Sequence, residues 1–234
     1  MGGLSDGELD VEVLGVISAG WQVERVRGPV AALHAADLPD RRVVRICEVV
    51  DAAVVLGSTQ SDSLLDRDAL DRSGLAAVRR RSGGGAVVLR PGDHLWVDLF
   101  VPVGDPLWED DVELAAWWVG EWWVRVVQGG ATVHRDSLSD RRAGSIACFA
   151  ARGPGEVVDA AGRKLVGVSQ RRTSAGARFQ TLAYLRWDPG TLPGLLTDRA
   201  AAQVVAPILR DRVRAVPEGG GLLDRFLEEA PEFG

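Results

Sequence analysis

The chain has 234 residues, of which 33 are acidic and 27 basic, so its formal charge is −6. This balance argues against a nucleic-acid-binding protein, and the lack of an apolar run of about 18 residues argues against a membrane span. Two cysteines, 46% hydrophobic residues and an N-terminus without a signal-peptide pattern together predict a soluble cytoplasmic protein with an ordinary core and no disulfide framework.

Hydrophobic spacing and turn residues predict short strands and helices in the first half of the chain. Residues 1–10 are polar and Gly-rich, which is typical of a frayed end. In chain order, the pattern predicts a helix at 29–38, strands at 43–49 and 53–56, a helix at 63–72, strands at 75–80 and 86–89 around a glycine loop at 82–85, and a strand at 94–101. Gly74 marks the end of the second helix, because glycine readily adopts the left-handed backbone there.

Tryptophan doublets open the second half. Within the doublets Trp117–Trp118 and Trp122–Trp123, Trp118 and Trp122 stand at i and i+4, which predicts a largely buried helix over 110–127. The other expected elements are a hairpin over 156–172 with its turn at 159–162, a strand at 179–187, a helix at 195–215 disrupted at Pro207, and a helix at 222–229. Hairpins interrupted by helices indicate an α+β fold: a mixed, mainly antiparallel central sheet flanked by helices. No repeat or long linker divides the chain, so 191–234 is expected to be a helical extension of a domain formed by 1–190.

Three consecutive glycines, Gly83 to Gly85, stand between two expected strands and follow three arginines. Without Cβ atoms, the backbone N–H groups of such a loop can approach an anion closely. Side chains alternate along a strand, so Arg80 should face opposite to Arg79 and Arg81. The pattern favours a cradle for a phosphate or carboxylate, and the alternative is a hairpin tip beside solvated arginines. It is not a P-loop, since no Gly-Lys-Ser/Thr follows.

Lys164 is the single lysine of the chain and stands against 26 arginines. Arginine cannot replace lysine where a compact point charge is needed. Lys164 lies on an expected strand between Gly162 and Gly167, where the glycines permit a ligand to come close. Its ammonium could neutralise a phosphate or acyl oxygen. The alternative is a solvated strand lysine.

Cysteine and histidine are the other candidates for chemistry. Cys148 lies 16 positions before Lys164, and a thiol near a cation would be a nucleophile. The alternative is a buried structural cysteine, which is the role assigned to Cys47 inside an apolar strand. The histidines have no metal-ligand spacing with one another or with the cysteines, so no metal site is expected. They are His34, His94 and His134.

Three segments carry a resemblance to a known family. Residues 79–87, Arg-Arg-Arg-Ser-Gly-Gly-Gly-Ala-Val, resemble the RRxSGGGAV signature of the lipoate–protein ligase and biotinyl/lipoyl transferase superfamily. Residues 162–170, Gly-Arg-Lys-Leu-Val-Gly-Val-Ser-Gln, are similar to its second signature, GxKIxGxAQ. Residues 53–60 look like the strand and GxxQ segment that precede both. The three occur in family order and together cover about residues 40–190.

The resemblance implies the catalytic-domain fold shared by biotin protein ligases and related to class II aminoacyl-tRNA synthetases, here over residues 1–190. It also implies a ligase that activates lipoate or octanoate with ATP and Mg²⁺ as an acyl-adenylate. The acyl group then passes to a lysine of a lipoyl-carrier domain of the apo E2 or H-protein type. By position, Lys164 contacts the acyl carbonyl and phosphate oxygens, as a fixed charge whose removal should abolish transfer with little loss of stability. The residues implied to line the acyl-adenylate are Arg80, Ser82, Gly83, Gly84, Gly85, Ala86, Gly167 and Ser169.

Departures from the family pattern leave two other functions open. Cys148-Phe149, with Glu156, resembles the Cys-Phe segment of octanoyl- and lipoyl-transferases that pass the acyl group through a cysteine thioester without ATP. The His-Gly pair of the ligases is missing from residues 179–182, Phe-Gln-Thr-Leu, which also admits a diverged acyl-binding paralogue without catalysis. About 45 residues follow Pro189, fewer than the ligases' C-terminal accessory domain, so an accessory subunit is a further possible partner.

Overall fold

The computed structural model describes residues 8–37, 39–216 and 221–231. Its main sheet has eight strands in the order β1-β2-β3-β7-β11-β10-β9-β8, and every pair is antiparallel except β2–β3. In that order the strands are Asp10–Ile17, Trp21–Gly28, Val43–Val49, His94–Pro102, Gly176–Tyr184, Lys164–Arg172, Val157–Val158 and Thr132–Val133. The fold is therefore α+β with a mixed, mainly antiparallel sheet, as the sequence predicts.

A second, three-stranded sheet carries the glycine loop. Its strands are β5 (Ala76–Arg79), β4 (Ala53–Leu56) and β6 (Val87–Leu89), with β4 central, parallel to β5 and antiparallel to β6. All four residues of β4 are buried, so this sheet anchors the loop between β5 and β6 against the core.

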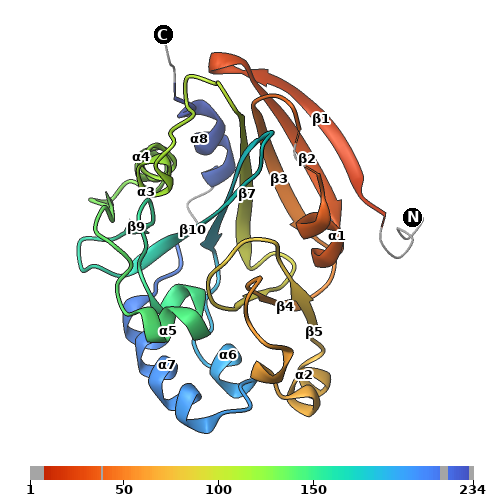
Figure 1. The fold of residues 1–234 in the computed structure, drawn as a ribbon, viewed down its shortest axis with the longest axis vertical. Coiled ribbons are helices and arrows are strands. Elements are labelled where there is room, and N and C mark those ends of the chain that lie inside the picture. The colour runs from red at the N-terminus through yellow and green to blue at the C-terminus, as the bar shows by residue number, and fades with distance from the viewer. Residues whose placement is uncertain (1–7, 38, 217–220, 232–234) are drawn as a thin grey trace.

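Helices lie on the main sheet and at one end of the molecule (Figure 1). They are α1 (Val30–Ala35), α2 (Arg67–Ser73), α3 (Val112–Ala115), α4 (Trp117–Val127), α5 (Arg141–Ile146), α6 (Thr191–Gly194), α7 (Arg199–Arg212) and α8 (Leu222–Glu228). The tryptophan stripe of α4 is core, because Trp122 and Trp123 are fully buried and both rings contact Phe226 of α8. Among the described residues, no helix is long and apolar enough to cross a membrane.

Several predicted elements have different ends. The helix expected at 29–38 stops at Ala35, because the backbone of Ala36 leaves the helical region with a ψ of 139°, and residue 38 lies outside the described residues. The helix expected at 63–72 begins at Arg67, since the Asp66 side chain accepts a hydrogen bond from the N–H of Ala69 and caps it, while Gly74 ends it in the left-handed region. The helix expected at 110–127 is divided at Ala116 into α3 and α4.

Other expectations are corrected by the structure. The helix α7 continues through Pro207, and the break lies before it, where Asp198 caps the helix. Proline has no N–H to donate to the carbonyl oxygen one turn earlier. Pro207 lies on the exposed face of the helix, where that oxygen can bond to water instead. The hairpin of β1 and β2 was not predicted, and β1 begins at Asp10, within the expected frayed end. The rest of that end, residues 1–7, lies outside the described residues. The elements β8, α5 and α6 were not predicted either.

Candidate active site

The glycine loop is held from beneath by Arg80. This side chain is buried, whereas Arg79 and Arg81 are exposed, so the predicted alternation is confirmed. Its guanidinium donates to the carbonyl oxygens of Gly83 at 2.7 Å and Gly85 at 2.9 Å, and its Nε donates to Ser82 Oγ at 3.1 Å. Burial lowers the pKa of Arg80, and its attraction to Cys148 raises it. The loop therefore has a defined shape with a buried positive charge behind it.

Two of the loop glycines are required, Gly85 by close backbone packing and Gly84 by its backbone conformation. A Cβ at Gly85 would lie 2.4 Å from the carbonyl oxygen of Gly144 and 2.6 Å from the nitrogen of Ala147. Gly84 has a φ of +94°, in the left-handed region. Gly83 faces open space and would accept a Cβ without contact. Gly85 thus allows the loop to pack closely against α5, whereas Gly83 remains exposed.

Cys148 follows α5 in a short 3₁₀ turn, Cys148–Ala150. Its N–H donates to the carbonyl oxygen of Ala86 at 3.0 Å, and the N–H of Ala86 donates to Ile146 at 2.9 Å. The cysteine is therefore fixed directly beside the end of the glycine loop. Cys148 is partly exposed, whereas Cys47 is buried as expected.

Lys164 is buried, with 1% of its surface exposed. Its Nζ donates to the carbonyl oxygens of Cys148 at 2.9 Å and Ala151 at 3.0 Å, and to Glu156 Oε1 at 2.6 Å. It also lies 4.7 Å from the centre of the Phe149 ring. All three ammonium hydrogens therefore have acceptors within the protein, and the solvated-lysine interpretation is wrong.

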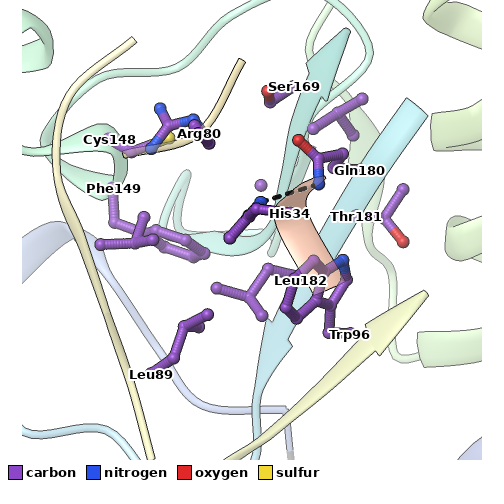
Figure 2. Close-up of a pocket in the computed structure, with 13 residues that line it drawn as sticks. His34, Arg80, Leu89, Trp96, Cys148, Phe149, Ser169, Gln180, Thr181 and Leu182 are labelled. Atoms are coloured by element: carbon purple, nitrogen blue, oxygen red, sulfur yellow. Dashed lines mark hydrogen bonds between the residues drawn. The ribbon is translucent and has the colours of Figure 1, made fainter. Parts of the chain in front are cut away.

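An apolar cavity opens between β10, β11 and the glycine loop (Figure 2). We call it the apolar cavity; it encloses about 420 Å³ of empty space, counting its opening to solvent. Its lining residues are His34, Arg80, Val87, Leu89, Trp96, Cys148, Phe149, Gly167, Val168, Ser169, Gln180, Thr181 and Leu182. Figure 2 shows Arg80 and Cys148 at the end of the cavity away from Trp96 and Leu89.

Gly167 has a role that its spacing from Lys164 did not predict. A Cβ at Gly167 would lie 3.1 Å from the ring of Phe149. The glycine therefore makes room for this aromatic wall of the cavity.

Polar side chains form a chain of hydrogen bonds along the cavity. Ser169 Oγ donates to Ser82 Oγ at 2.6 Å, and Ser82 Oγ lies 3.1 Å from Gln180 Oε1. Gln180 Nε2 lies 3.2 Å from His34 Nδ1. His34 is 6% exposed, and burial lowers its pKa well below the usual value, as do the charges of Arg178 and Arg80.

A second hollow, the glycine cleft, adjoins the apolar cavity. It contains about 980 Å³ of empty space, counting its opening to solvent. It is lined by Gly83 to Gly85, the α3 residues Val112 and Glu113, Ala116, Leu138, Gly144, the 148–156 segment at Cys148, Ala151, Gly153, Pro154 and Glu156, and Val168 to Gln170. Cys148, Val168 and Ser169 line both hollows. Cys148 therefore stands where the two meet, whereas Lys164 lines neither.

The structure thus brings together the predicted residues from the glycine loop, Cys148 and the Lys164 strand. It adds His34, Trp96, Phe149 and Gln180 to the wall of the site. His34 was considered only as a metal ligand, and among the described residues no group of three His, Cys, Asp or Glu side chains could hold a metal ion. The sequence does carry a signal for His34. It is the polar residue of an otherwise apolar short helix, so its imidazole can lie on the buried face of that helix.

Comparison with known proteins gives one consistent result. The family model "Lipoyl protein ligase A/B catalytic domain" matches residues 30–221. A bi-partite lipoate protein ligase from Thermoplasma acidophilum, described together with its E2 lipoyl domain, is 16% identical, with a TM-score of 0.59 over 85% of this chain and 73% of that one.

Two other solved structures share the fold. A lipoate-protein ligase A bound with ATP is 16% identical, with a TM-score of 0.58 over 85% of this chain and 75% of that one. LipL1 of P. falciparum in complex with lipoate is 10% identical, with a TM-score of 0.54 over 81% of this chain and 46% of that one. No curated protein sequence matches the chain.

Proposed function

Because this chain belongs to the lipoyl protein ligase A/B catalytic-domain family, we propose that it moves a lipoyl- or octanoyl-type acyl group onto a lysine of a lipoyl-carrier domain, and that Cys148 carries the group as a thioester. The position of Cys148 is the main support. It lines the apolar cavity, which suits an acyl chain, and also the glycine cleft, from which a donor and an acceptor can approach.

The first step is thioester exchange. The Cys148 thiolate attacks the carbonyl carbon of a donor thioester, the new C–S bond forms, and the donor's C–S bond breaks. The donor leaves as a thiol and takes up the proton that Cys148 lost. Arg80 is buried and lines the same cavity as Cys148, so its positive charge attracts the thiolate.

The second step transfers the acyl group to the acceptor. The neutral ε-amine of the carrier lysine attacks the Cys148 thioester, a C–N bond forms, and the C–S bond breaks. The amine proton passes to the Cys148 sulfur. Both steps place negative charge on the acyl oxygen, which N–H groups and hydroxyls can stabilise. Gly83 to Gly85, Gly167 and Ser169 line the two hollows beside Cys148 and are proposed to bind the acyl group. The hydroxyl hydrogens of Ser82 and Ser169 and the N–H of Ala86 are already donated within the protein, so these groups are proposed to hold the loop rather than the acyl oxygen.

Lys164 is proposed to position the nucleophile rather than to bind phosphate. Its ammonium donates to the backbone oxygens of Cys148 and Ala151, at the two ends of the turn that carries the thiol. Glu156 completes the arrangement, because its other oxygen accepts from the N–H of Gly153 at 2.8 Å. We therefore expect the Lys164–Glu156 pair to hold the 148–156 segment in place. The ammonium of Lys164 directly contacts the backbone of Cys148.

ATP-dependent ligation is the second candidate, and the exposed backbone of Gly83 and Gly84 in the large glycine cleft favours it. A nucleotide phosphate could bind such a backbone. Of the carboxylates that line this cleft, Glu156 is paired with Lys164, which leaves Glu113. These residues do not fit an Mg²⁺ site of the protein's own, so the metal would have to enter with the nucleotide. An accessory subunit belongs to this candidate.

One assay distinguishes the candidates. The protein is given an apo lipoyl-carrier domain and either an octanoyl-carrier thioester or octanoate with ATP and Mg²⁺, and the acceptor is weighed by mass spectrometry. We expect octanoylated acceptor from the thioester donor. This product should be lost in Cys148→Ser and retained in Cys47→Ala. When the acceptor lysine is replaced, an octanoyl group should remain on Cys148. Product that needs ATP and survives Cys148→Ser would establish the ligase instead. No product from either donor would favour an acyl-binding protein without catalysis.

A further inference from the structure

The imidazole of His34 is a buried polar group in a mainly apolar cavity. It lies against Trp96, with ring centres 4.5 Å apart. Its Nε2 is buried and has no hydrogen-bond partner among the residues that the structure describes. A buried donor without an acceptor is unfavourable, and such groups in native proteins usually have a partner.

The hydrogen-bond chain along the cavity defines which nitrogen of His34 carries the proton. Gln180 Oε1 accepts from Ser82, so the amide nitrogen of Gln180 faces His34 and donates to Nδ1. A neutral imidazole that accepts at Nδ1 carries its proton on Nε2. Because burial and the charges of Arg178 and Arg80 lower the pKa of His34, the ring stays neutral. His34 therefore presents a neutral N–H donor at Nε2.

The backbone beneath His34 is fixed as well. Arg178 donates to the carbonyl oxygens of Leu33 at 2.9 Å and His34 at 3.3 Å, at the end of α1. The same guanidinium pairs with Asp98, and both side chains are almost completely buried. The imidazole is thus held in the cavity wall rather than free to turn toward solvent.

We propose that His34 determines acyl specificity: its Nε2–H selects an acyl chain that carries a hydrogen-bond acceptor, either the ring sulfurs of a dithiolane or an oxygen, over a plain alkyl chain. This inference rests on the proposed function for the identity of the cavity's ligand as an acyl chain. An acceptor-bearing chain would pair the orphaned donor, whereas a plain alkyl chain would bury it unpaired. The imidazole reaches β11 at Gln180.

Equilibrium binding of free acids tests the proposal without requiring any transfer. Calorimetry would compare octanoate, lipoate and a series of octanoates with a hydroxyl group at successive carbons. We expect at least one acceptor-bearing acid to bind about tenfold more tightly than octanoate. In His34→Phe, which keeps an aromatic ring against Trp96 but removes the donor, this preference should fall to within about twofold.

His94→Phe is the matched control, because His94 is a second mostly buried histidine that does not line the cavity. It should leave the preference unchanged. His34→Gln retains an N–H donor and should restore part of the preference if the loss in His34→Phe reflects hydrogen bonding rather than packing. Octanoate that binds as tightly as every acceptor-bearing acid, or a preference that survives His34→Phe, would overturn the proposal. If the protein shows this His34-dependent preference among acids but transfers no acyl group to a carrier, the proposed function would be overturned and the proposal for His34 would stand.

Discussion

Two buried ion pairs lie behind the walls of the apolar cavity and use the same chemistry on different segments. The ammonium of Lys164 pairs with Glu156 and donates to backbone oxygens around Cys148. The guanidinium of Arg178 pairs with Asp98 and donates to backbone oxygens of α1 around His34. In each pair a buried cation fixes a short segment whose side chain enters the cavity. The first segment carries the thiol proposed for catalysis, and the second carries the imidazole proposed for selectivity.

Removing Lys164 should have the largest effect. Lys164→Met leaves Glu156 buried without its cation, so we expect unfolding to become easier by about 3–5 kcal/mol. We also expect transfer to fall by at least about 100-fold, as when a preorganised active-site group is lost. This revises the expectation of unchanged stability, because the lysine is not solvated. Thermal unfolding and the carrier-acylation assay measure both effects.

The double variant Lys164→Met/Glu156→Leu is the control for stability. It removes both charges, so much of the lost stability should return while transfer stays low. Recovered transfer in the double variant would show that the lysine serves folding alone.

Removing Arg178 should distinguish the role of the Arg178–Asp98 pair from that of the Lys164–Glu156 pair. Arg178→Met leaves Asp98 unpaired, and we expect a similar loss of about 3–5 kcal/mol in the free energy of unfolding. At a temperature where the variant is folded, transfer from an octanoyl donor should fall less than in Lys164→Met, while the preference among acids should weaken because α1 is no longer fixed. A variant that keeps its preference but loses transfer as completely as Lys164→Met would contradict the division between the two pairs.

The glycine loop offers a smaller, paired test on the Cys148 side of the cavity. Gly85→Ala places a Cβ against backbone atoms of Gly144 and Ala147, so we expect a loss of about 1–3 kcal/mol in stability. Gly83→Ala meets no atom within 4 Å and has no positive φ, so its melting temperature should be unchanged. If Gly83 binds ligand through its backbone, Gly83→Ala should instead raise the KM for the acyl donor. Equal destabilisation by both substitutions would refute the observed packing.

The smallest effect concerns pH. Burial lowers the pKa of His34 and of His94, to about 4 for His94, whereas both titrate near 6.5 in an unfolded chain. As the pH drops below about 6.5, the unfolded chain binds protons that the folded chain does not, so the free energy of unfolding falls toward pH 4. Denaturant unfolding between pH 7 and pH 5 should show this slope, and it should be shallower in His94→Gln. A protein that becomes more stable on acidification would contradict the burial of these rings.

Local patterns predicted much of the fold and part of the site. Hydrophobic alternation and turn residues located β3, β4, β7 and the β9–β10 hairpin, and the fold class followed from their order. The glycine motif and the motif around Lys164 identified the segments that meet at the site. The β1–β2 hairpin was not predicted, although β1 carries Val11, Val13 and Val16; these apolar side chains are exposed rather than part of the core.

Tertiary structure decided what those segments do. The sequence placed Lys164 on a strand between glycines, but the chain's own carbonyl oxygens and Glu156 take up its hydrogens, which no spacing in the sequence reveals. His34 lies about 130 positions before the Lys164 motif, yet it meets Gln180 because Arg178 holds α1 against β11. Local propensity fixes the elements, whereas the desolvation of a charge and the contacts of a side chain depend on distant segments that only the folded core brings together.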